Sequence, residues 1–159
     1  MPPTLVPTAV ATLPRVDHYV LSRPFPRSET LVDYADRTYA YGSTQGGARD
    51  VHLGVDYANV RHTPVLAVGA GTVIFAETDS STRVGPAYDY YGNTVIVQHD
   101  TSAPNGEPLY TLYGHLQEIY VPVGKYVTPG DPLGTVGGQR DRHRATFASR
   151  SARGRRWAG

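Results

Sequence analysis

Two side chains that could bind a metal ion, His52 and Asp56, stand four residues apart in the first half of the chain. Imidazole nitrogens and carboxylate oxygens are both common zinc ligands, each lying about 2 Å from the ion. Residues four apart share one face of a helix, but Gly54 and Val55 between them disfavour a helix. On a fully extended strand the two residues would lie ~13 Å apart, which is too far to bind one ion. A strand therefore needs a bend between them, and Gly54 permits one.

Other histidines add to this candidate site or compete with it. His115 follows a predicted strand in L-Y-G-H-L, where a histidine beside a glycine can reach into a cleft and act as a general base. The alternative for His115 is a hydrogen-bonded histidine packed in the core, and the alternative for His52 and Asp56 is a surface pair. His99 ends a predicted strand and is expected to be structural or exposed, while His62 stands in a turn and is expected to be exposed.

The composition indicates a single domain rich in turns and strands. The 159 residues include 17 Gly, 13 Pro and 12 Tyr. The absence of Cys excludes disulfides and thiolate metal sites. No run is apolar and long enough to span a membrane. Residues 5–13 are mildly apolar but hold a proline and lack a basic leader, so no signal peptide is visible.

Short runs of β-branched and aromatic residues alternate with turns, and no segment keeps a helical period. Asn105–Gly106 is a strong hairpin signal, and residues 78–91 form a long polar insertion. Residues 39–47 form a loop that leads into the His52 segment and could line a cleft. The expected strands are residues 63–68, 72–76, 93–99, 109–113, 120–123, 126–127 and 133–136. This spacing predicts an all-β fold, either a sandwich or a barrel.

Five motifs occur in a specific order, and their order and spacing carry more information than any one of them. They are H-x-G-x-D, T-P-V-x-A-x-x-x-G-T-V, Y-G-N-x-V-x-x-x-H, L-Y-G-H-L and V-x-x-G-D-x-L-G-x-V-G. Together they resemble the lysostaphin/LytM-type zinc metallopeptidases over roughly residues 17–138. The resemblance implies an antiparallel β-sheet groove, of the duplicated hybrid motif type, with one zinc ion at its floor.

The same resemblance implies roles for individual residues. His52 and Asp56 would be zinc ligands, and His115 a catalytic histidine acting on the zinc-bound water, whose pKa the ion lowers to about 7. Members of this family cleave peptide cross-links in bacterial cell walls. We therefore expect peptidoglycan peptides as partners, no nucleic acid, a monomer, and a location in the cell envelope or outside the cell.

The family pattern ends in H-x-H, usually within H-L-H-F-E, and this chain lacks it. The second histidine of that motif supplies the third zinc ligand. Residues 139–159 instead contain seven Arg, one Asp and a lone His143, a net charge of +6 against −5 for the rest of the chain. We expect this tail to be disordered and to leave the sheet incomplete at its C-terminus, and we expect His143 not to reach the metal site.

A shifted reading frame is one interpretation of this tail. Codons allowed for residues 140–151 can be read out of frame as G-S-T-S-G-H-L-(Arg or Cys)-(Leu or Phe)-E-V-R, which is close to the family ending. The shifted frame cannot place a histidine at the third-ligand position. The Ala148 codon fixes the last two bases of that triplet as G and C, and no histidine codon ends in these bases. The alternative interpretation is a basic tail that contacts an anionic polymer.

Three functions remain open on the sequence alone. The first is a zinc endopeptidase of the cell wall, impaired in this copy and with residues 17–138 as its domain after a linker at residues 1–16. The second is a non-catalytic domain of the same fold that binds peptidoglycan or activates another hydrolase. The third and weakest is a biotinyl or lipoyl carrier, suggested by V-G-K-Y-V-T-P-G-D-P-L-G-T-V, which lacks the modified lysine in its tight turn.

Overall fold

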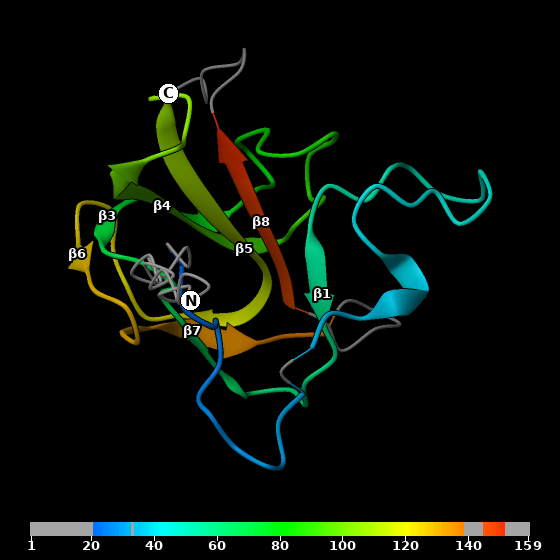
Figure 1. Cartoon of the computed structure of the whole chain (residues 1–159), viewed down its shortest axis with the longest axis horizontal. Coiled ribbons are helices and arrows are strands. Elements are labelled where there is room, and N and C mark those ends of the chain that lie inside the picture. Colours follow the sequence, from blue (N-terminus) through cyan, green and yellow to red (C-terminus); the bar gives the residue numbers. More distant parts are fainter. Residues whose placement is uncertain (1–20, 33, 139–144, 152–159) are drawn as a thin grey trace, which may run out of the picture.

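The computed structural model describes residues 21–32, 34–138 and 145–151 of the chain (Figure 1). One short 3-10 helix, η1 (Arg37–Tyr39), precedes the strands. The strands are β1 (Val55–Tyr57), β2 (Pro64–Leu66), β3 (Gly71–Thr78), β4 (Asn93–Ser102), β5 (Pro108–Ile119), β6 (Tyr126–Val127), β7 (Pro132–Val136) and β8 (Ala145–Ser151). Within this part of the chain, no helix has the length and apolar character needed to cross a membrane.

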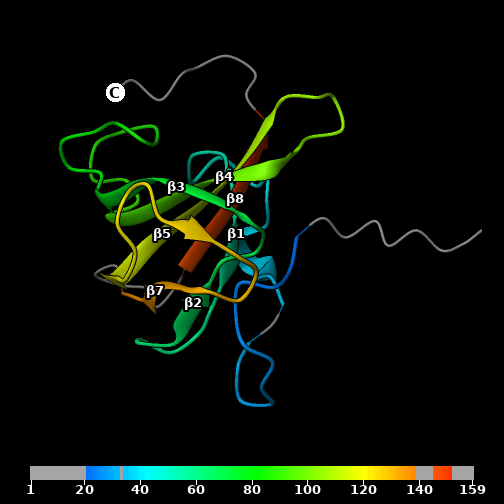
Figure 2. The same cartoon turned by 90° about the vertical axis from the view of Figure 1, so that its left-hand side faces the viewer.

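All strand pairs are antiparallel, and the main sheet has the order β1-β8-β5-β4-β3-β6. The long strand β5 also pairs with β7 near its C-terminal end, and β7 pairs with β2. The sheet therefore curls around β5 instead of lying flat, as Figures 1 and 2 show. The expected all-β fold with an antiparallel sheet is confirmed.

The alternating side chains of the strands separate two apolar layers. On β4, Val95 and Val97 enter the main core, whereas Ile96 between them faces the other side of the sheet. On β5, Tyr113 belongs to the main core and Leu112 to the second cluster. The second cluster consists of Val84, Tyr91, Ile96 and Leu112, so residues from the β3–β4 loop cover this face.

Two expectations about secondary structure are wrong. Residues 120–123 connect β5 to β6 and form no strand. Residues 145–151, expected to be disordered and unfit for the sheet, form β8 between β1 and β5. Strand hydrogen bonds join backbone groups, so a segment without apolar alternation can still fill a gap between two strands whose N–H and C=O groups need partners. The linker at residues 1–16 and His143 lie outside the described residues.

Candidate functional site

His52 is held in place by the loop that precedes β1. Its backbone N–H donates to the carbonyl of Ser43 (2.9 Å), and its own carbonyl accepts from Gly42 (2.8 Å). The ring stacks on Tyr39, with centroids 4.3 Å apart and planes at 8°. Nδ1 lies 2.6 Å from the Tyr39 carbonyl, which can only accept, so Nδ1 carries a proton and Nε2 is left for the site.

Asp56 lies on β1, and its carboxylate meets the histidine directly. Asp56 Oδ1 is 3.2 Å from His52 Nε2, and both residues are buried. The chain bends at Gly54 just before β1 begins at Val55, so the two side chains meet despite their separation in sequence. Next along β1, Tyr57 packs against the main core, so the carboxylate faces the opposite side of the sheet.

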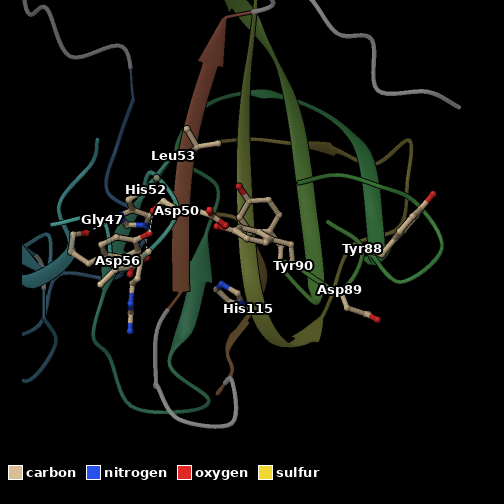
Figure 3. A pocket seen from close by; sticks show the side chains of 14 residues that line it. Gly47, Asp50, His52, Leu53, Asp56, Tyr88, Asp89, Tyr90 and His115 are labelled. Carbon is tan, nitrogen blue, oxygen red and sulfur yellow. Dashed lines mark hydrogen bonds and ion pairs between the residues drawn. The ribbon is translucent and has the colours of Figure 1, made fainter. Parts of the chain in front are cut away.

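His115 lies across β8 from this pair, on the curled part of β5 (Figure 3). Its Nδ1 is buried and has no hydrogen-bond partner among the described residues. Burial lowers the pKa of His115, and the nearby carboxylates of Asp56 and Asp79 oppose that shift. Buried ring nitrogens usually have a hydrogen-bond partner, so this one is unusual.

The three residues open onto one cavity of about 730 Å3 (Figure 3). Its lining also includes residues from the loop before β1 and from the β3–β4 loop, namely Tyr39, Gly47, Ala48, Arg49, Asp50, Leu53, Gly54, Tyr88, Asp89, Tyr90 and Tyr91. Of the segment from Tyr39 to Gly47, which was expected to line a cleft, the two end residues line the cavity and residues 40–46 do not. The β3–β4 residues were not predicted, although the run Y-D-Y-Y at residues 88–91 is unusually aromatic for a solvent loop.

His99 and His62 lie away from this cavity. His99 is buried, with Nδ1 3.1 Å from the Ala70 carbonyl and Nε2 2.8 Å from the Thr111 hydroxyl. His62 is exposed, with a left-handed backbone at φ 69°. A structural role for His99 and an exposed position for His62 match the expectations from sequence.

The donors on the described part of the chain are too few for a three-ligand zinc site. His52 and Asp56 have the right chemistry and separation for two ligands. Among the described residues, however, no three or more His, Cys, Asp or Glu side chains are grouped so as to hold a metal ion. The site thus fits two of the three protein ligands that a catalytic zinc ion normally has.

The family model for Peptidase family M23 matches residues 50–151, more than half of the chain and all of its long strands. The chain belongs to this family. The family is zinc-dependent. The match extends through β8, which joins the tail segment at residues 145–151 to the family fold.

Individual relatives agree with this assignment. The chain is 36% identical over 86 residues to the peptidoglycan DD-endopeptidase ShyA of Vibrio cholerae, covering 54% of this chain and 16% of that protein. It is 30% identical over 97 residues to the uncharacterized lipoprotein YgeR of Escherichia coli K12, covering 61% of this chain and 32% of that protein. The chain therefore spans at most about a third of the length of either relative.

Among solved structures, the chain is similar to the catalytic domain of lysostaphin from Staphylococcus simulans. The two share 25% identity with a TM-score of 0.53, over 74% of this chain and 77% of that domain. This likeness covers most of a catalytic domain, which supports a peptidase-type domain.

Proposed function

We propose that this domain binds the peptide cross-links of bacterial peptidoglycan in the cavity beside His52, Asp56 and His115, as a metalloendopeptidase-type domain whose hydrolytic activity is impaired. The observation that carries the proposal is the 3.2 Å approach of His52 Nε2 to Asp56 Oδ1 at the cavity that His115 also lines. In this assignment His52 and Asp56 are metal ligands and His115 is the catalytic histidine.

The lining of the cavity suits a polar peptide. Tyrosine rings offer flat apolar faces with a hydroxyl at one end, which bind chains that combine methyl groups with amides. Arg49, held 5.1 Å from the Tyr39 ring centroid, offers a cation for a carboxylate, and Asp50 and Asp89 offer anions for an amine. Peptidoglycan peptides carry all of these groups, and one relative is a peptidoglycan DD-endopeptidase. A location in the cell envelope or outside the cell belongs to the same proposal, because peptidoglycan is found there.

The donor count among the described residues supports the proposed impairment. Zinc supplies a Lewis acid and an activated water when three protein ligands hold it and the fourth position stays open. With two donors on the described residues, we expect a lower zinc affinity than three ligands would give. We therefore assign no hydrolytic step to this chain. The same donor count favours a second candidate function, a non-catalytic domain that binds peptidoglycan or activates another cell-wall hydrolase.

Binding and hydrolysis are separable by experiment. Purified protein is incubated with insoluble peptidoglycan, sedimented and quantified, and the soluble fraction is analysed for released peptides with and without added zinc. We expect sedimentation with peptidoglycan and little or no release. Release of peptides as fast as by a relative with all three zinc ligands would contradict the proposed impairment. Failure of the protein to sediment with peptidoglycan, even when zinc is added, would exclude peptidoglycan as its ligand.

A further inference from the structure

Asp79 is a buried carboxylate that does not line the cavity described above. It follows β3 directly and is fully buried. Its Oδ2 accepts a hydrogen bond from the Tyr91 backbone N–H at 2.8 Å, and its Oδ1 accepts one from the Gly92 N–H at 2.9 Å. Two adjacent backbone donors are thus satisfied by the two oxygens of one carboxylate, and hydrogen bonds to an ionised acceptor are the stronger kind.

The backbone of Asp79 also forms hydrogen bonds with the end of the β3–β4 loop. Its N–H donates to the Gly92 carbonyl at 3.1 Å, and its carbonyl accepts from the Asp89 N–H at 3.2 Å. Together with the side-chain bonds, four hydrogen bonds join this one residue to the far end of the β3–β4 loop. The position of Tyr91 therefore depends on Asp79.

Tyr91 in turn contacts His115. The His115 backbone N–H donates to the Tyr91 carbonyl at 2.7 Å, and the centroids of the two side-chain rings lie 6.1 Å apart. Tyr91 also packs against Gly114 so closely that a Cβ there would lie 3.0 Å from the tyrosine ring. No residue with a side chain fits at position 114 without moving Tyr91.

His115 has a backbone conformation that needs such support. Its φ is 58°, in the left-handed region that residues with a Cβ rarely adopt. The N–H is fixed by Tyr91, and the carbonyl accepts from the Gly137 N–H at 2.9 Å. Strained residues persist only where their surroundings determine them from several sides, and Tyr91 provides one of the two backbone contacts here.

We propose that Asp79 is a positioning residue for His115, acting through the backbone of Tyr91. Removing the carboxylate leaves the Tyr91 and Gly92 N–H groups without their acceptor, frees the end of the loop and lets the His115 ring leave its place in the cavity. The link to catalysis or peptide binding rests on the proposed function of the site, whereas the link from Asp79 to His115 does not.

Three variants test this assignment. Asp79→Ala removes both acceptor oxygens, and Asp79→Asn keeps one. Val127→Ala is the control, because Val127 is buried in the main core on β6, the edge strand at the opposite end of the sheet order from β1. The ring signals of His115, assigned with a His115→Gln variant, are followed by proton–carbon NMR. Thermal unfolding and binding of a soluble peptidoglycan peptide are measured on the same samples.

The expected result is a shift of the His115 ring signals in Asp79→Ala and a smaller shift in Asp79→Asn. Val127→Ala lowers the melting temperature without moving those signals. Unmoved His115 signals in a folded Asp79 variant would overturn the proposal, and Asp79→Asn decides if Asp79→Ala does not fold. An equally large shift of the His115 signals in Val127→Ala would also overturn the proposal, because any loss of stability would then produce the same shift. If the unaltered protein binds no peptide, the proposed function fails while the NMR comparison still decides the role of Asp79.

Discussion

The Asp56 carboxylate lies 3.2 Å from His52 Nε2, although four positions along a straight strand would separate the two residues far more widely. The bend at Gly54 brings them together, and two loops complete the cavity around them.

The first prediction concerns space beside Tyr91. Gly114→Ala places a Cβ 3.0 Å from the Tyr91 ring, and the resulting overpacking is expected to cost about 1–3 kcal/mol of stability. Because Tyr91 holds the His115 backbone, the His115 ring signals should shift in the NMR spectrum as well.

Gly106→Ala is the matched control for that variant. Gly106 has φ 79° and no neighbouring atom within 4 Å, so an added methyl group strains only the local backbone, by about 1 kcal/mol. We expect a loss of stability at the lower end of the range given for Gly114→Ala, with unchanged His115 signals. Shifts of equal size in both variants would show that the Tyr91 contact does not position the histidine.

The second prediction concerns Tyr88, which lines the cavity but is 58% exposed. Tyr88→Ala should leave the free energy of unfolding within ~0.5 kcal/mol of the unaltered protein. It should weaken binding of a peptidoglycan peptide about tenfold, as loss of an aromatic contact at a binding surface commonly does. Tyr120, 53% exposed and outside the cavity lining, supplies the control variant Tyr120→Ala. Equal affinities of the two variants would exclude Tyr88 from the binding surface.

The third prediction is a pH dependence of stability that originates at His99. Burial lowers the pKa of His99 below its usual value of 6.5 in the folded protein. As the pH falls through 6.5, the unfolded chain therefore takes up the proton first, and stability is lost until the lowered folded pKa is reached. The melting temperature of His99→Gln should fall less than that of the unaltered protein between neutral pH and about pH 5. If the melting temperature of His99→Gln falls with pH as steeply as that of the unaltered protein, the pH dependence comes from other groups.

Much of this architecture could be predicted from sequence, for reasons that particular residues make plain. The consecutive β-branched residues Val95, Ile96 and Val97 indicate a strand that is buried on both faces. Asn105–Gly106 indicates the hairpin between β4 and β5. The bend at Gly54 follows from the distance between a metal ion and its ligands alone. These features depend on local geometry, so neighbouring residues are enough to reveal them.

The rest depends on contacts between distant segments. Asp79 begins a polar stretch and looks like a solvent-exposed acid until the loop returns to bury it against the backbone of Tyr91. Strand β8 was missed because it pairs through its backbone with two strands remote in sequence, and its residue types give no alternating signal. The partners in both cases become apparent only after the sheet has formed.

The fourth prediction concerns the tail, because β8 lies between the strand that carries Asp56 and the strand that carries His115. A third metal ligand is therefore best placed on β8. Thr146 is the register partner of Asp56, so a histidine introduced as Thr146→His would share a face with that carboxylate. We expect this variant to bind zinc at least tenfold more tightly than the unaltered chain, since it adds a third donor.

A chain with residues 145–151 replaced by H-L-H-F-E-V-R tests the reading-frame interpretation. Its histidines occupy positions 145 and 147, so the strand must shift by one residue to bring one of them opposite Asp56. We expect a higher melting temperature than that of the unaltered chain and a further increase on adding zinc. Equal melting temperatures and equal gains from zinc in the two chains would favour the tail as an authentic part of the protein.

The central claim is that His52 and Asp56 form a metal site, and calorimetric titration of zinc tests it most directly. The account predicts weak binding at one site in the unaltered protein, loss of that binding in His52→Ala, and no change in the exposed-histidine control His62→Ala. Each variant is first shown to be folded by its unfolding transition. Equal zinc affinity and stoichiometry in the unaltered protein and in folded His52→Ala would contradict the account.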